Sequence, residues 1–107
     1  MELVGKFIKV GNYHYITIPA EVRDHWKSVL MEDVDIVSVD FNEKENEMIV
    51  FPRQISRHGY FRKVIKRSNV WLITVPREIA NRWSHEGVVF LRKLYDEKLL
   101  KLVVKPM

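Results

Sequence analysis

The sequence of 107 residues contains no cysteine, so neither a disulfide framework nor a thiolate metal site is available. No apolar run approaches the roughly 20 residues that a membrane-spanning helix needs. The first eleven residues mix one acid and two lysines with apolar side chains, which is not the pattern of a signal peptide. We therefore expect a cytoplasmic protein with no membrane partner.

Motifs of common enzyme classes are also absent. The chain has only four glycines, and it contains neither a Gly-x-Ser-x-Gly nucleophile motif nor a glycine-rich phosphate loop. Its histidines, His14, His25, His58 and His85, lack the close spacing of metal ligands. We therefore expect a protein that is not an enzyme and that has no cofactor and no metal site.

Charged residues are abundant but unevenly distributed. Residues 1–52 hold five Lys/Arg against ten Asp/Glu, a net charge of −5, whereas residues 53–107 hold thirteen against four, a net charge of +9. Seven of the ten acids fall within residues 32–47, where DFNEKENEM is typical of a solvated hairpin turn with flanking strands. A polyanion partner suits the basic half if its cations share a face, and solvated surface charge is the alternative.

A repeat accounts for nearly the whole chain. Residues 7–26 align without a gap with residues 64–83, and eight of the twenty positions are identical. The similarity continues from residues 34–52 to residues 88–106, where each copy reads strand, polar turn, strand, proline. The sequence therefore predicts two β-β-α-β-β units.

Each copy contains a strand that runs into a proline. Ile16 and Ile18 alternate with other side chains, as do Ile73 and Val75, which is the period of a strand with one buried face. Proline is favoured as the first helical residue, because its missing N–H has no intrahelical partner there. We therefore predict a strand followed by a short helix in each copy.

The predicted helices have one apolar stripe. Val22 and Trp26 are four residues apart, as are Ile79 and Trp83, so each pair lies on one helical face. We expect both tryptophans to be largely buried and Gly87 to close the second helix.

The repeats define the predicted organisation: residues 1–52 are the first repeat, residues 53–63 a basic join, and residues 64–107 the second repeat. A unit of about fifty residues buries only about 60% of its unfolded surface and is marginally stable alone. We therefore expect one compact domain, a mainly β fold with short helices in which the repeats form the two halves of a two-fold symmetric barrel.

A recurring pattern of Gly-Asn, an apolar residue, proline and a short helix is found in both copies. The matching residues are Gly11, Asn12, Ile18, Pro19, Glu21 and Val22 in the first copy, and Asn69, Val75, Pro76, Glu78 and Ile79 in the second, where Ser68 replaces the glycine. This pattern resembles the AbrB/MazE/SpoVT superfamily of swapped-hairpin transcription regulators. The resemblance covers almost all of the chain.

The resemblance implies a swapped-hairpin β-barrel, here a pseudo-dimer, that binds DNA through its N-terminal strands, the loops after them and nearby basic residues. The residues at these positions are Lys6, Lys9, Asn12 and His14 in the first copy, and Lys63, Lys66, Arg67 and Asn69 in the second. The helical residues Arg23, Lys27, Arg77 and Arg82 could add contacts.

The sequence departs from the family in its loops. They read NYHY and NVWL, without the basic residue that many members carry. The aromatic Trp71 could stack on bases or cap the core, and capping is favoured because large aromatics are usually packed. Asn12 and Asn69 either read bases or shape tight turns. Val10 stands opposite Arg67, so a strict palindrome is not an obligatory target.

The sequence and this resemblance thus predict a prokaryotic or archaeal DNA-binding transcription regulator, located in the cytoplasm at the nucleoid, with double-stranded DNA as its partner. The alternative is a protein-interaction or antitoxin-like scaffold without strong DNA binding, whose protein partner meets the acidic residues 32–47. The sequence leaves open whether two fused chains pair further as a homodimer.

Overall fold

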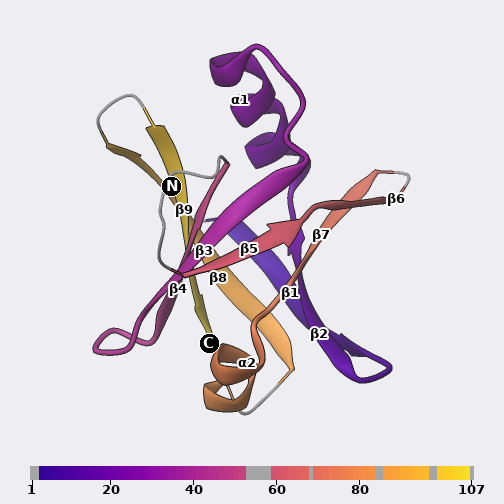
Figure 1. Cartoon of the computed structure of the whole chain (residues 1–107), viewed down its shortest axis with the longest axis vertical. Helices are drawn as coiled ribbons and strands as arrows, with labels where there is room; N and C mark the ends of the chain where they lie inside the picture. Colours follow the sequence, from indigo (N-terminus) through magenta and orange to yellow (C-terminus); the bar gives the residue numbers. More distant parts are fainter. Residues whose placement is uncertain (1–2, 53–58, 68, 84–85, 97–98, 107) are drawn as a thin grey trace.

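The computed structural model of the protein describes residues 3–52, 59–67, 69–83, 86–96 and 99–106. Its elements in chain order are β1 (Leu3–Val10), β2 (Tyr13–Ile18), α1 (Ala20–Leu30), β3 (Ile36–Asn42), β4 (Glu47–Phe51), β5 (Tyr60–Lys63), β6 (Ile65–Arg67), β7 (Val70–Thr74), α2 (Arg77–Arg82), β8 (Gly87–Asp96) and β9 (Leu99–Pro106). The predicted mainly β fold with short helices is confirmed (Figure 1).

The strands form one nine-stranded antiparallel sheet in the order β5-β3-β4-β9-β8-β1-β2-β7-β6. The β1–β2 hairpin of the first repeat lies between β8 and β7, which both belong to the second repeat. The β3–β4 hairpin of the first repeat lies between β9 of the second repeat and β5, which forms the end of the predicted join. Hairpins of the two repeats therefore alternate around the sheet, which confirms the swapped-hairpin arrangement.

The chain itself nearly closes this sheet into a barrel. Its two edge strands, β5 and β6, are consecutive and are separated only by Val64. β5 pairs with β3, and β6 pairs with β7. The Val64 N–H, between β5 and β6 in the chain, donates to the Asp35 carbonyl oxygen at 2.8 Å. β1 is divided in the same way, since residues 3–7 pair with β8 and residues 7–10 with β2. Of the predicted join, residues 53–58 lie outside the described residues and residues 60–63 form β5.

Strand pairing corrects one part of the repeat alignment. Lys6 pairs with Val88, and the equivalent Lys63 pairs with Ile36. Ile36 therefore corresponds to Val88, whereas the sequence alignment places Val34 there. The alignment is wrong by two residues because α2 has 6 residues and α1 has 11, so the second repeat reaches its next strand sooner.

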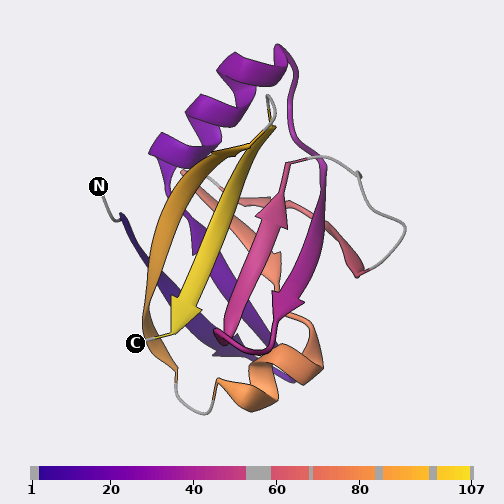
Figure 2. The same ribbon diagram turned by 90° about the vertical axis from the view of Figure 1, so that its left-hand side faces the viewer.

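The two helices lie at opposite ends of the barrel (Figure 2). We predicted Pro19 and Pro76 as the first helical residues, but they are the N-cap residues, one position earlier, with extended ψ values of 152° and 141°. The prediction for Gly87 is wrong: α2 ends at Arg82, and Gly87 begins β8 with a φ of 140°, a conformation that favours glycine. The C-cap residue of α2 is Trp83, whose N–H donates to the Ile79 carbonyl oxygen.

The core fills the space between the sheet and the helices. Trp26 and Trp83 are 0% and 2% exposed, which confirms their predicted burial. The apolar positions that alternate along β2 and β7 are buried as well, as the sequence predicted. The Trp83 indole N–H donates to the Asn46 carbonyl oxygen at 3.3 Å, so α2 is tied to the β3–β4 turn.

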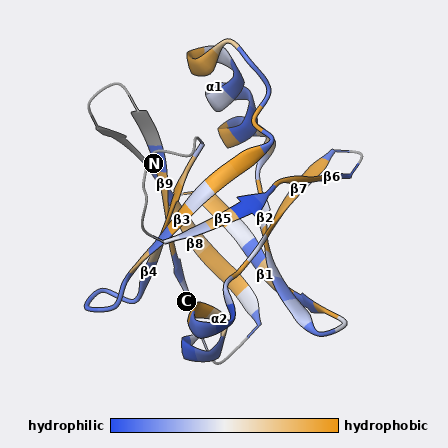
Figure 3. Ribbon diagram, in the orientation of Figure 1, coloured by the Kyte–Doolittle hydropathy of each residue, from blue (hydrophilic) through white to orange (hydrophobic). Residues whose placement is uncertain are grey.

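The β3–β4 turn covers residues 43–46, between paired Asn42 and Glu47. It is hydrophilic over its length (Figure 3), and Asn46 adopts a φ of 56°. The prediction of a hairpin turn with flanking strands is confirmed for the acidic segment.

Candidate functional site

One group of strands contains basic residues but no acidic ones. Together, β1, β2, β5, β6 and β7 contain six Lys/Arg and no Asp/Glu. The six cations are Lys6, Lys9, Arg62, Lys63, Lys66 and Arg67. The β3–β4 hairpin contains four acids and one lysine. β8 and β9 add four Lys/Arg and one Asp, so the β3–β4 hairpin is the acidic part of the sheet.

Five of these six cations are exposed, and Lys6, Lys63 and Arg67 are three of them. Lys6 alternates with the buried Gly5 and Phe7, so its side chain points away from the core. Lys63 and Arg67 are likewise exposed, in β5 and β6. In the part of the chain that the structure describes, the side chains of these three cations have no ion-pair partner. Their charges are available to an anionic partner.

Two further predicted site residues are engaged around Trp71. Lys66 Nζ lies 2.8 Å from Asp35 Oδ1 and 5.1 Å from the centre of the Trp71 ring. The Arg23 guanidinium lies 5.7 Å from the same ring and donates to the Asn69 carbonyl oxygen at 3.4 Å. Trp71 is only 7% exposed, so it caps the core, as the sequence favoured.

Two cations of the helices, Lys27 and Arg82, also have partners within the chain and lie far from each other. Lys27 Nζ is 3.5 Å from Asp33 Oδ1. Arg82 donates to the Glu43 carbonyl oxygen at 3.4 Å, and its guanidinium lies 5.4 Å from the centre of the Phe41 ring. Because α1 and α2 lie at opposite ends of the barrel (Figure 2), the structure does not bring Lys27 and Arg82 together.

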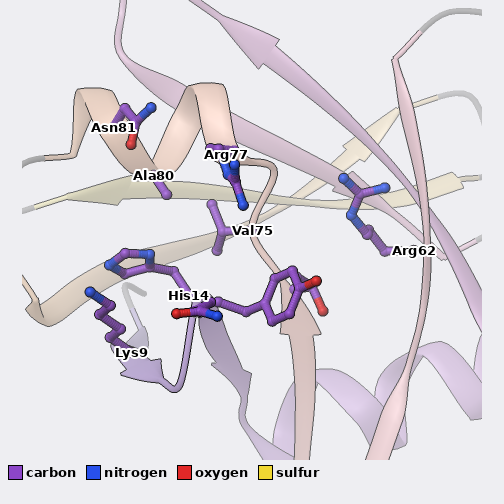
Figure 4. A pocket seen from close by; sticks show the side chains of 10 residues that line it. Lys9, His14, Arg62, Val75, Arg77, Ala80 and Asn81 are labelled. Carbon is purple, nitrogen blue, oxygen red and sulfur yellow. The ribbon is translucent and has the colours of Figure 1, made fainter.

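A groove of about 600 Å³ lies between the β1–β2 turn, β5 and α2 (Figure 4). It brings together four predicted site residues, Lys9, Asn12, His14 and Arg77. Arg62 and Asn81 line the same groove and were not predicted. We call it the cationic groove, after Lys9, Arg62 and Arg77.

A sequence signal for Arg62 existed. Extending the gapless repeat alignment back by two residues places Arg62 opposite Gly5, within a strand of the repeat. On the sequence alone, residue 62 falls in the join, because the basic run around it looks like a connection. Only the pairing of β5 with β3 shows that this residue belongs to the barrel.

Tyr60 and Glu78 lie beside the cationic groove. The Tyr60 hydroxyl donates to Glu78 Oε2 at 2.7 Å. This hydrogen bond is the main cause that lowers the pKa of Glu78 below its ordinary value, and the charges of Arg62 and Arg77 add to it. The same bond, together with desolvation, raises the pKa of Tyr60. The carboxylate therefore remains ionised next to the two arginines.

Arg62 is held on its own strand. Its guanidinium lies 5.2 Å from the centre of the Tyr60 ring and donates to the Phe61 carbonyl oxygen at 2.9 Å. On the other side of the groove, the His14 ring stacks on Phe7 with 4.9 Å between ring centres. Contacts with neighbouring rings thus orient side chains on both sides of the groove.

The tips of the two N-terminal hairpins present the predicted asparagines. Val10 pairs with Tyr13, so Gly11 and Asn12 form a two-residue turn in which Gly11 has a φ of 63°. This is the position that a type II′ turn reserves for glycine. Asn12 thus lies in a tight turn, and Asn69 also lies in a turn; both are exposed, and base reading stays a prediction for them.

The described residues give little support to a metal site or a membrane-spanning helix. Among them, no three His, Asp or Glu side chains lie close enough together to hold a metal ion, and His58 and His85 lie outside the described residues. Neither helix in the described part of the chain is long and apolar enough to cross a membrane. No family model matches the chain, and neither curated proteins nor solved structures provide a match.

Proposed function

We propose that this protein is a non-enzymatic DNA-binding regulator of the AbrB/MazE/SpoVT type, in which two fused repeats act as a pseudo-dimer. The observation that carries the proposal is the charge of β1, β2, β5, β6 and β7, with six cations and no acid. A polyanion that approaches these strands meets no carboxylate belonging to them, so local repulsion is low and attraction accumulates.

The strand order supports the same proposal. β1, β2, β7 and β6 are consecutive in the sheet, so the N-terminal hairpins of the two repeats lie side by side. These hairpins are the elements through which the superfamily resemblance implies DNA contact. One chain here supplies both of them.

Affinity comes mainly from contacts to phosphates, which release counterions from the DNA. Lys6, Lys63 and Arg67 are the exposed cations suited to this role. Val10 occupies the position equivalent to Arg67, so the second repeat contributes more and the preferred site need not be a palindrome. Base preference falls to side chains at the hairpin tips, of which Asn12 is one.

The test is a mobility-shift titration of the full chain with duplex DNA at low and moderate salt. The double variant Lys63→Gln/Arg67→Gln should weaken binding and reduce the log–log salt slope by up to about 0.9 for each phosphate that the variant no longer neutralises. The control variant Lys44→Gln/Lys105→Gln removes the same charge from exposed positions on β9 and on the β3–β4 turn. It should leave affinity and slope nearly unchanged. Equal weakening by both variants contradicts the assignment of the DNA-facing strands.

The second candidate is a protein-interaction module. Its support is the β3–β4 turn, where Glu43 and Glu45 are exposed next to a single lysine and where a basic partner surface would be attracted. A wild-type chain that shifts no duplex even at low salt would place this candidate ahead of DNA binding.

A further inference from the structure

The barrel contains two equivalent grooves, one for each repeat. The first half of β1 pairs with β8 instead of β2, which leaves the second half of β2 unpaired with β1. β5 and β7 are separated in the same way, because β5 pairs with β3 and it is β6 that pairs with β7 on this side. The cationic groove is lined by residues of β5 and β7, and a second groove of about 360 Å³ is lined by residues of β1 and β2.

Equivalent positions in the two grooves carry different side chains. Arg62 of the cationic groove corresponds to Gly5 of the second groove. Arg77 corresponds to Ala20. A Cβ atom at Gly5 would lie 3.0 Å from the Thr17 carbonyl oxygen, so a larger residue there requires this neighbouring backbone to give way by a few tenths of an ångström. The fold builds the groove twice, but only one copy carries the two guanidinium groups.

The third cation is also different from its equivalent. Lys66, which corresponds to Lys9, is bonded to Asp35 at 2.8 Å. The ammonium group of Lys9 has no ion-pair partner within the described residues. Figure 4 shows Lys9, Arg62 and Arg77 on different sides of the groove, where they come from β1, β5 and α2. Three separate elements therefore direct positive charge at one cavity.

We propose that the cationic groove binds a phosphoryl group, held by Arg62 and Arg77 together with Lys9. Guanidinium groups make paired, charge-assisted hydrogen bonds to phosphate oxygens, and an ammonium group adds a point charge. The amides of Asn12 and Asn81 supply neutral donors to the remaining oxygens. This inference does not depend on the DNA-binding proposal.

Two carboxylates lie beside the groove without cancelling its charge. Glu78 accepts the hydroxyl hydrogen bond of Tyr60 at 2.7 Å. Glu86 accepts the backbone N–H of Lys9 at 2.6 Å. Neither lines the groove, whose lining in the described part of the chain has three cations and no acid. Three cations against these two carboxylates leave a positive local balance, which suits an anionic ligand.

The size of the groove fits a phosphoryl group with something attached. Its volume of about 600 Å³ lies inside the range of roughly 300–1,000 Å³ that small-molecule sites occupy. Val75 and Ala80 give it an apolar part against which the attached group can pack. Two sources share this chemistry: a phosphorylated small molecule and a phosphate of a DNA backbone.

The test is a titration of the full chain with inorganic phosphate at constant ionic strength, followed by amide NMR. We expect shifts to concentrate at groove residues such as His14 and Asn81. Arg77→Gln should weaken phosphate binding roughly tenfold, because it removes charge-assisted hydrogen bonds to the ligand. Arg77 is exposed, so the variant should fold, and an unchanged melting curve verifies this. The Lys44→Gln/Lys105→Gln control should change phosphate binding less than twofold.

Two further ligands separate the sources. If Arg77→Gln weakens binding of adenosine monophosphate but leaves the affinity for duplex DNA unchanged, the groove takes a small phosphorylated molecule. If both affinities fall together, the groove holds a backbone phosphate. Shifts scattered over the surface, or equal weakening by Arg77→Gln and the control, overturn the inference. Duplex binding that persists in that case leaves the DNA-binding proposal standing.

Discussion

The Tyr60 hydroxyl donates a 2.7 Å hydrogen bond to Glu78 Oε2 and so joins β5 to α2 beside the cationic groove. Arg62 lies over the Tyr60 ring, and Arg77 precedes Glu78 in the chain. The bond therefore connects the two elements that carry the arginines of the groove. It also raises the pKa of Tyr60 and lowers the pKa of Glu78.

The first prediction concerns pH. The folded-state pKa of Glu78 is below its ordinary value of 4.5, so its contribution to the free energy of unfolding is present above about pH 4.5 and is lost as pH falls through the folded-state value. Tyr60→Phe removes the hydrogen bond, and we expect the pKa of Glu78 to rise toward 4.5 in a carbon NMR titration of the carboxyl group.

The same variant has a matched control. Tyr13→Phe removes a hydroxyl from an exposed tyrosine and should leave the Glu78 pKa unchanged. Tyr60 has a raised pKa, so its own contribution is complete below its ordinary value of 10.0 and is lost as pH rises through the folded-state value. An unaltered Glu78 pKa in Tyr60→Phe would show that the hydrogen bond is not formed in solution.

The second prediction compares the two buried tryptophans. Trp→Ala at Trp26 or Trp83 should cost about 3–5 kcal/mol in urea denaturation. Trp83→Phe should cost about 0.5–1.5 kcal/mol more than Trp26→Phe, since it also loses the bond to the Asn46 carbonyl oxygen, whereas within the described residues the buried Trp26 indole N–H has no acceptor. Val10→Ala, at a 58% exposed position, should stay within about 0.5 kcal/mol. Equal costs of Trp26→Phe and Trp83→Phe would contradict the assigned hydrogen bond.

The third prediction tests the interleaving of the repeats. Residues 1–52 and residues 53–107 should each fail to fold as monomers, because every hairpin of one fragment is flanked by strands of the other. Mixing the two fragments should restore β structure in circular dichroism and a cooperative melt. Independent cooperative melting of either monomeric fragment is the result that would rule out the alternating arrangement.

The fourth prediction separates two neighbouring cations of β6. Lys66→Gln breaks the bond to Asp35 and should lower the free energy of unfolding by about 0.2–1 kcal/mol, a small cost because both side chains are partly exposed. Asp35→Asn should produce a similar decrease, and the double variant little more than either. Arg67→Gln should leave the free energy of unfolding within about 0.5 kcal/mol.

For DNA affinity, we expect the opposite order: Arg67→Gln should have a larger effect than Lys66→Gln. Arg67 is exposed and has no ion-pair partner within the described residues, so its substitution should weaken duplex binding and lower the salt slope. Lys66 is held by Asp35, and its substitution should affect duplex binding less. A mobility-shift titration at two salt concentrations measures both. A larger DNA effect for Lys66→Gln would mean that the Asp35 bond opens on binding.

Much of the barrel could be predicted from the sequence because the signals were local. The alternation of Ile16 and Ile18, repeated in the second copy, determined which face of a strand is buried. The spacing of Trp26 and Trp83 from their apolar partners determined which face of each helix packs inward. Periodicity of this kind depends only on backbone geometry, so it can be recognised without knowing which strands pair.

The tertiary structure decided what depends on register and on distant neighbours. The two-residue shift between β3 and β8 follows from the pairing of Lys63 with Ile36, which no local pattern encodes. Arg62 looked like part of a linker until β5 paired with β3 and placed it beside Arg77. Whether a cation has an ion-pair partner depends on residues that are distant in the chain, as for Lys66 and Asp35, which are 31 residues apart. The sequence determined the units and their buried faces through short-range geometry, while the grooves and their charges arose only when the two repeats were interleaved.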